Sequence, residues 1–229
     1  MDRRRTSVPF DPFFFEKQQR DGRSYSLRET FERIYTSNHW SGPDSVSGAG
    51  ASDDQTAQLR QTLPELLASL GAEVLLDLPC GDGRWMQQLE LPIAKYIGAD
   101  IVAELVETNQ RRYSSPDREF LLLDLTRDAL PPADVLLCRD CLVHFSFADI
   151  RRALANIRAN PITYLLTTTF PLCATNEEIT TGDWRVLNFQ AAPFDFPPPL
   201  ALLNESCSEG DGLFTDKSLG LWRVADLPG

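Results

Sequence analysis

The 229-residue sequence predicts an α/β fold with a doubly wound, mostly parallel sheet, and three observations support this prediction. Short apolar runs alternate along the chain with segments of helical periodicity, the pattern of strands covered by helices on both faces. The first apolar run ends in a glycine-containing turn, and the last two runs have the pattern of a hairpin. The length and the 42% hydrophobic content suit one domain with a sizeable core.

We expect residues 1–50 to form an N-terminal arm and a lid over a cleft, and residues 51–229 to form the α/β domain. Leu27 to Tyr35 has weak helical amphipathicity, whereas residues 37–50 are rich in Ser, Gly and Pro and predict a loop.

A helix is predicted after Asp53 because Leu59, Leu63, Leu67 and others recur at helical spacing. Gly71 supplies its stop, and Pro64 is expected to bend or divide it.

Five apolar runs are predicted as parallel strands, over residues 73–78, 96–100, 119–124, 133–139 and 164–169. Helices are predicted over 85–91 and 103–112, and another begins at Ser146, which has the spacing of a capping box with Asp149. The first three strands are expected to end in Asp77, Asp100 and Asp124.

The last sixty residues change in character. Residues 171–199 are rich in turn formers and proline, so we expect a long functional excursion. Residues 200–206 and 218–225 predict an antiparallel C-terminal hairpin, which brings the sheet to seven strands.

Ligands bind a doubly wound sheet beyond the carboxyl ends of its strands, so the three aspartates are expected to cluster. Gly81 and Gly83 allow backbone N–H groups to approach a polar ligand, and Asp100 is placed to accept hydrogen bonds from ribose hydroxyls. A dinucleotide fingerprint would need Gly or Ala where the chain has Met86. The residues therefore favour a nucleoside cofactor without a pyrophosphate, and the acidic surroundings suit a sulfonium such as that of S-adenosylmethionine.

These residues resemble the successive motifs of class I S-adenosylmethionine-dependent methyltransferases, a Rossmann-like group, over about residues 55–170. The resemblance lies in Asp77-Leu78-Pro79-Cys80-Gly81-Asp82-Gly83, Asp100, Asp124-Leu125 and residues 134–144. More narrowly, residues 98–102, 138–144 and 216–222 resemble a group of small bacterial methyltransferases of unassigned substrate.

The resemblance implies S-adenosylmethionine as the cofactor and S-adenosylhomocysteine as its product. It implies that Asp77 and the backbone after Cys80 face the methionine part, Asp100 the ribose, and Asp124 with Leu125 the adenine. Arg139 would offer its backbone carbonyl to the methionine ammonium, and Pro79 departs from the family's usual glycine. The expected cofactor residues are Asp77, Pro79, Cys80, Gly81, Gly83, Asp100, Ile101, Asp124, Leu125 and Arg139. Trp40 and Trp85 are added to this set from their position alone, and packing in the core is the alternative for each.

Asp140 and His144 follow the fourth strand and are the candidate catalytic residues, because an oxygen or protonated nitrogen nucleophile needs a proton acceptor. The alternatives are a turn or helix cap for Asp140 and a structural role for His144. Cys138, Cys141 and His144 have metal-like spacing, but no second cysteine pair follows, so no metal is predicted.

A polar acceptor, most simply a small molecule, is predicted from polar residues on irregular segments beside the cleft. These candidate substrate residues are Asp183, Trp184, Arg185, Asn188, Asn204, Glu205 and Lys217. A peptide or protein side chain is the next acceptor considered. The net charge of −11 disfavours a nucleic-acid substrate unless Arg3 to Arg5 supply a basic face.

The five cysteines favour reduced thiols, and the sequence lacks an apolar run typical of a signal peptide or membrane span. We therefore expect a soluble cytoplasmic enzyme, whose oligomeric state the sequence leaves open. Two alternatives remain: an NAD(P)-dependent Rossmann oxidoreductase, and a protein that binds S-adenosylmethionine without turnover.

Overall fold

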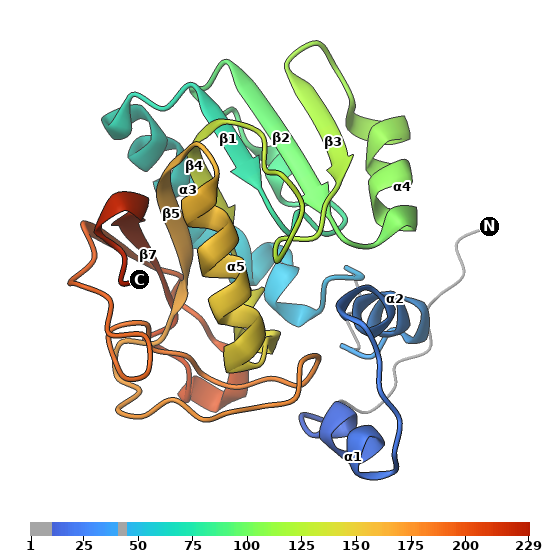
Figure 1. The fold of residues 1–229 in the computed structure, drawn as a ribbon. Helices are drawn as coiled ribbons and strands as arrows, with labels where there is room; N and C mark the ends of the chain where they lie inside the picture. Colours follow the sequence, from blue (N-terminus) through green and yellow to red (C-terminus); the bar gives the residue numbers. More distant parts are fainter. Residues whose placement is uncertain (1–10, 41–44) are drawn as a thin grey trace.

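The computed structural model describes residues 11–40 and 45–229, which form a seven-stranded sheet between helices (Figure 1). The strand order is β3-β2-β1-β4-β5-β7-β6. Strands β1 to β5 are parallel, β7 is antiparallel to β5, and β6 is antiparallel to β7. The predicted doubly wound, mostly parallel sheet with an antiparallel C-terminal hairpin is confirmed.

The strands are β1 Val74–Asp77, β2 Lys95–Asp100, β3 Arg118–Leu122, β4 Ala133–Cys138, β5 Ile162–Thr169, β6 Ala201–Asn204 and β7 Ser218–Arg223. The α-helices are α1 Phe14–Arg20, α2 Leu27–Ser37, α3 Asp53–Leu70, α4 Ala103–Tyr113 and α5 Phe147–Ala159.

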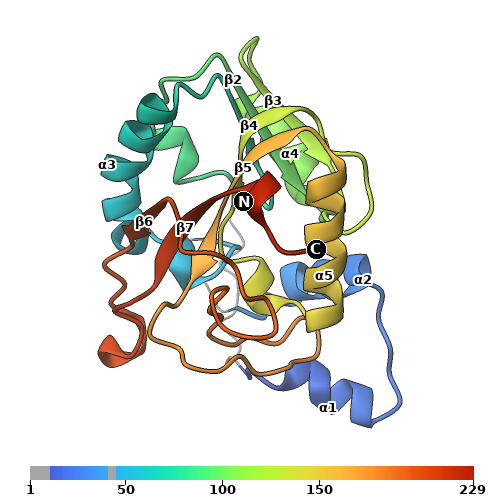
Figure 2. The same ribbon diagram turned by 60° about the vertical axis from the view of Figure 1, so that its left-hand side comes forward.

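Helices α3 and α5 cover opposite faces of the sheet (Figure 2). Leu59 and Leu63 of α3 pack in one hydrophobic cluster with Leu75 of β1, while Ile150 of α5 packs in a second cluster with Leu76. Successive side chains of a strand point to opposite faces, so Leu75 and Leu76 serve different cores. This explains why the strand segments are apolar throughout.

Helix α3 is a single 18-residue helix that Pro64 does not divide, so that part of the sequence prediction is wrong. The Ser52 hydroxyl accepts a backbone N–H at its start, and Gly71 ends it with φ of +61°. Leu63 and Leu67, next to Pro64 and one turn beyond it, are fully buried. Their packing outweighs the backbone hydrogen bond that proline cannot donate.

The helix predicted over residues 85–91 is also absent, because the segment contains only the 3-10 turn Met86–Gln88. Gly83 precedes it in the left-handed conformation, with φ of +66°. Pro92 follows it and disfavours a helical conformation at Leu91. Too few residues remain between these limits for a stable α-helix.

Helices α1 and α2 lie beyond the carboxyl ends of the parallel strands (Figure 1). A capping box between Ser26 and Glu29 starts α2. Residues 171–199 form no helix or strand, as expected for an excursion. Arg3 to Arg5 lie outside the described residues, as do positions 41–44 of the predicted loop. None of the described helices is long and apolar enough to cross a membrane.

Candidate active site

A cavity lies at the carboxyl ends of β1, β2 and β4, and α2 forms one of its walls. Ten of the twelve predicted cofactor residues line it: Trp40, Asp77, Pro79, Cys80, Gly81, Trp85, Asp100, Ile101, Leu125 and Arg139. Gly83 and Asp124 do not line it. The cavity coincides with the edge of the sheet where a doubly wound fold binds its ligands.

The glycine turn after β1 has a tightly fixed backbone. Gly81 has φ of +55°, and a Cβ atom there would lie 2.1 Å from the Ser47 hydroxyl oxygen. The Gly83 N–H donates to the Cys80 carbonyl at 3.1 Å, so Gly83 shapes the turn without reaching the cavity. Asn109 of α4 donates its amide to the Gly81 carbonyl at 2.8 Å. Any other residue at position 81 would carry the strain of a positive φ and would have to displace the Ser47 hydroxyl.

Asp77 and Asp100 are two buried carboxyl groups in the cavity wall. Burial raises the pKa of Asp77 to about 7, against the hydrogen bond that the Tyr96 hydroxyl donates to it at 2.7 Å. Burial raises the pKa of Asp100 to about 6, although the Val102 and Gly81 amides donate to it at 2.9 and 3.1 Å. Within residues 11–40 and 45–229, neither carboxylate has an ion pair within 4 Å. A bound cation or hydroxyl donor would therefore compensate for their desolvation.

Asp124 lies two residues beyond the end of β3, and its carboxylate faces its own loop. One oxygen accepts the Thr126 N–H at 2.9 Å, and the other lies 3.2 Å from the Arg127 guanidinium. The neighbours Leu123 and Leu125 line the cavity instead. This loop therefore offers apolar contact to a ligand.

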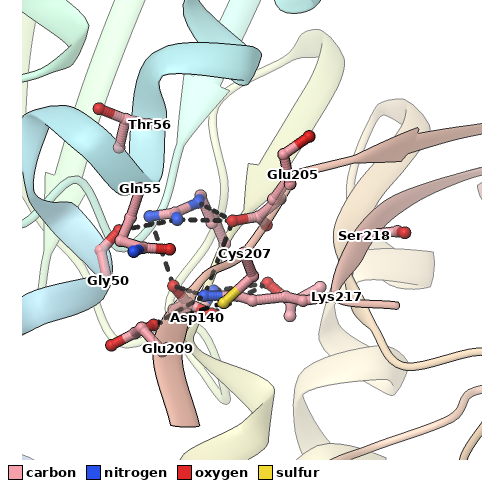
Figure 3. Close-up of polar contacts among 12 residues, drawn as sticks. Gly50, Gln55, Thr56, Asp140, Glu205, Cys207, Glu209, Lys217 and Ser218 are labelled. Atoms are coloured by element: carbon pink, nitrogen blue, oxygen red, sulfur yellow. Dashed lines mark hydrogen bonds and ion pairs between the residues drawn. The ribbon is translucent and has the colours of Figure 1, made fainter. Parts of the chain in front are cut away.

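A group of buried or half-buried charged residues lies at the end of β4 (Figure 3). We call it the charge cluster, and it consists of Arg139, Asp140, Glu205 and Lys217. Arg139 donates to Glu205 at 2.6 Å, and Lys217 donates to Asp140 at 2.8 Å. Figure 3 shows the side chains of Glu205 and Lys217 converging with Asp140, and Gly50 lies beside them. Gly50 accepts a hydrogen bond from Arg139 at 2.8 Å through its carbonyl.

The charge cluster keeps Asp140 ionised. Burial opposes the charge, but Lys217 and Arg139 outweigh it and hold the pKa of Asp140 well below its usual range. The same attraction raises the pKa of Lys217 despite its burial. Asp140 also has φ of +49°, a strained backbone that recurs at functional sites. Its carboxylate is thus a fixed negative charge on the cavity wall.

His144 is buried behind the cavity wall and stacks against Trp40, with ring centroids 4.6 Å apart. Its Nδ1 lies 2.9 Å from the Asp183 carbonyl oxygen, which can only accept, so Nδ1 carries the proton and Nε2 does not. Burial lowers the pKa of His144 to about 4, so the ring is neutral near pH 7. The indole Nε1 of Trp40 is buried with no hydrogen-bond acceptor among the residues that the structure describes.

The seven predicted substrate residues lie outside the cavity wall and bind other parts of the chain. Asp183 accepts the amides of α1, and Arg185 donates to the Leu142 and Phe145 carbonyls. Asn188 and Asn204 bind loop carbonyls, Trp184 packs against Phe170 and Phe214, and Glu205 and Lys217 belong to the charge cluster.

Sequence reasoning missed several wall residues, notably Phe31 and Tyr35 of α2, Ser47 and Phe145. The amphipathic pattern and capping box of α2 were visible in the sequence, and they signalled a helix with one apolar face. No local pattern indicates that this face closes over the ends of β1 and β2.

Residues 75–160 match the family described as a methyltransferase domain. A S-adenosylmethionine-dependent methyltransferase from Leishmania major has a similar structure, with a TM-score of 0.60, 16% identity and 90% of each chain covered. Human N-acetylserotonin methyltransferase, solved with S-adenosylmethionine, gives a TM-score of 0.58 at 16% identity over 91% of this chain and 64% of its own length.

Magnesium protoporphyrin IX methyltransferase from Synechocystis gives a TM-score of 0.50 at 18% identity, with 68% of this chain and 81% of its own covered. No curated protein matches the sequence. The chain therefore shares its fold with these proteins, at identities too low to transfer a substrate.

Proposed function

Because the chain carries a methyltransferase domain on the class I fold, we propose that it binds S-adenosylmethionine and transfers the methyl group to a small-molecule acceptor. The observation that carries this proposal is the pair of buried carboxyl groups, Asp77 and Asp100, beside the glycine turn. S-adenosylmethionine supplies an electrophilic methyl group on a sulfonium. The positive charge and the ribose hydroxyls of S-adenosylmethionine suit the two buried carboxyl groups of Asp77 and Asp100.

We assign the ribose hydroxyls to Asp100 and the positively charged part of the cofactor to Asp77. The backbone at Cys80 and Gly81 would contact the methionine part, and Leu125 would contact the adenine. The apolar face of α2 supports this assignment, since Phe31 and Tyr35 pack on the segment that follows Asp100. On the same grounds residues 1–50 are proposed as an arm and lid, and residues 51–229 as the catalytic domain.

The acceptor is proposed to enter between α2 and the end of β4, where Asp140, Cys141 and Phe145 line the cavity. His144 does not line the cavity, so we propose that it accepts the proton through one bridging water, because its Nε2 lone pair is unprotonated at neutral pH. Asp140 stabilises positive charge that develops on the acceptor. Orientation in the closed cavity supplies the larger part of the rate, on the order of 7–11 kcal/mol for well-aligned reactants.

One structural observation disfavours the NAD(P) alternative. A pyrophosphate is normally stabilised by the N-terminus of the helix that follows the glycine turn. In this chain that segment is the 3-10 turn Met86–Gln88.

The five free cysteines of the chain suit a reducing compartment such as the cytoplasm.

Titration calorimetry with S-adenosylmethionine, S-adenosylhomocysteine and NADPH tests the proposal. The first two ligands should bind, and Asp100→Asn should weaken both by about 10-fold or more, because a charged hydrogen-bond acceptor is lost. Asp134→Asn is the matched control: Asp134 also accepts two backbone amides, both at 2.8 Å, but at the opposite end of the sheet.

A folded wild-type protein that gives no heat with either adenosyl ligand while NADPH saturates it would overturn the assignment. Incubation with methyl-labelled S-adenosylmethionine and a metabolite pool then separates an enzyme from a binding protein, because only an enzyme yields a labelled product.

A further inference from the structure

Asp183 belongs to two interactions at once, one through its side chain and one through its main chain. Its carboxylate accepts the Phe15 and Glu16 amides of α1, at 2.7 and 2.9 Å. Its carbonyl oxygen accepts the proton on Nδ1 of His144 at 2.9 Å. The side chain is only 1% exposed, so these contacts account for its position rather than a contact with solvent.

The residue before it strengthens the same connection. The Gly182 N–H donates to the His144 carbonyl at 2.8 Å. Gly182 has φ of +106°, and a Cβ atom there would lie 2.5 Å from the Phe15 ring and 2.7 Å from the methyl group of Thr30. Gly182 and Asp183 therefore contact both helix α1 and the segment after β4 that carries His144.

We propose that Asp183 is a positioning residue that couples the docking of α1 to the orientation of His144. While α1 is seated, its amides fix the Asp183 carboxylate, and the Asp183 carbonyl then keeps the His144 proton on Nδ1. When α1 is displaced, only the backbone hydrogen bonds of Gly182 and Arg185 to the His144 segment still hold the Asp183 carbonyl, and the tautomer of His144 is less firmly fixed. The importance of this coupling for methyl transfer rests on the proposed function, in which Nε2 accepts a proton.

Two kinds of neighbour act on the His144 ring besides Asp183. Trp40 covers one face of the ring. Among charged groups, Asp140 favours protonation of the ring, while Arg185 and Lys217 oppose it. These three side chains lie outside α1, so displacement of α1 reaches the ring through the Gly182–Asp183 connection or through His39, which contacts Phe14 and Phe15 and precedes Trp40.

The chain has only two histidines, which makes imidazole NMR a direct test. The His39 ring lies 5.0 Å from the Phe14 ring and 5.8 Å from the Phe15 ring, so its signals report the docking of α1. The ¹⁵N signals of His144 report its tautomer. No ligand or acceptor is needed.

In the wild-type protein we expect His144 as the Nδ1–H tautomer, with a pKa of about 4. Asp183→Asn should shift the His39 signals and convert His144 to a mixture of tautomers. Phe15→Ala is a second variant, which loosens α1 without substituting a residue of the 171–199 excursion, although the lost ring packs on Gly182. Asp216→Asn should change neither histidine, although Asp216 likewise accepts a backbone amide, from Leu172 at 2.8 Å.

Amide hydrogen exchange at Phe15 and Glu16 completes the test. If these amides are released while the His144 tautomer stays unchanged, the coupling does not exist. The proposal also fails if neither variant releases them, or if wild-type His144 carries its proton on Nε2. Failure of the adenosyl ligands to bind would instead count against the proposed function and leave this result standing.

Discussion

Gly81 and Gly71 share a left-handed backbone but have different surroundings. Both have positive φ, yet a Cβ at Gly71 would meet nothing within 4 Å, whereas one at Gly81 would collide with Ser47. We expect Gly81→Ala to lower the affinity for S-adenosylhomocysteine by about 10-fold or more, because the added Cβ displaces the Ser47 side chain, which lines the cavity. Calorimetry on the purified variant measures this.

Gly71→Ala is the control, since it carries the left-handed strain of about 1–2 kcal/mol without the collision. It should lower the thermal midpoint and leave ligand affinity unchanged. Equal affinity losses in the two variants would show that strain, not the contact with Ser47, determines the effect.

Glu205 shows what a single buried charge contributes to stability. It is 1% exposed and lies between Arg139 and Lys217. Glu205→Gln leaves two buried cations with Asp140 at 2.8 Å and Glu209 at 4.0 Å from Lys217 as the counter-charges among the residues described, and should lower the free energy of unfolding by about 3–5 kcal/mol. Urea denaturation measures the loss, and Glu90→Gln on the exposed surface is the control. A loss below about 1 kcal/mol would contradict this account.

Strand periodicity located Asp77, Asp100 and Arg139 because a strand end fixes where the next side chain lies. Asp124 does not line the cavity, since β3 ends two residues earlier and the carboxylate closes its own loop. Asp183 and Arg185, which were predicted from the irregular 171–199 segment, also lie outside the cavity wall. Polar residues on irregular backbone are often needed to satisfy that backbone, and the sequence does not separate this role from ligand contact.

At the scale of the element, apolar periodicity predicted the five parallel strands, α4, α5 and the C-terminal hairpin. The two errors have opposite causes. Packing of buried leucines keeps α3 continuous through Pro64, whereas Gly83 and Pro92 leave too short a segment for a helix after β1. Tertiary contacts determined the first outcome, and the short length of the available segment determined the second.

Helix α2 gives a prediction at this scale, because its stability controls one wall of the cavity. Ser26→Ala removes the hydroxyl that accepts the Glu29 N–H, at a cost of about 1 kcal/mol. The amides of α2 should then exchange about fivefold faster with solvent, and S-adenosylhomocysteine should bind correspondingly less tightly.

Hydrogen exchange followed by mass spectrometry measures the opening of α2. Ser69→Ala is the matched control, because Ser69 is an exposed helical serine on α3 that does not cap a helix. Unchanged exchange in α2 would show that its packing on the Ile101 segment, and not the cap, holds it in place.

For the whole molecule, the pKa of Asp77 links stability to pH. The folded protein holds the Asp77 proton up to about pH 7, whereas the unfolded chain releases it near pH 3.9. Between these values the folded state binds more protons, so this group's contribution to stability falls as pH rises. Comparison of the wild type with Asp77→Asn separates the contribution of Asp77 from those of the other titrating groups.

The difference in unfolding free energy between wild type and Asp77→Asn should therefore decrease from pH 5 to pH 7 and become constant above about pH 8. Urea denaturation at each pH gives the difference. A difference that is flat or increases over that range would mean that Asp77 ionises normally in the folded protein.

The sheet order has a consequence for how the molecule is made. Strand β7 lies between β5 and β6, and Lys217 directly precedes it. A nascent chain released only as far as the 171–199 excursion would expose the edge of β5 and leave Arg139 without Glu205. Synthesis can thus complete the β1 and β2 side of the cavity early, whereas the ion pairs at the end of β4 form only after the hairpin of β6 and β7 has left the ribosome.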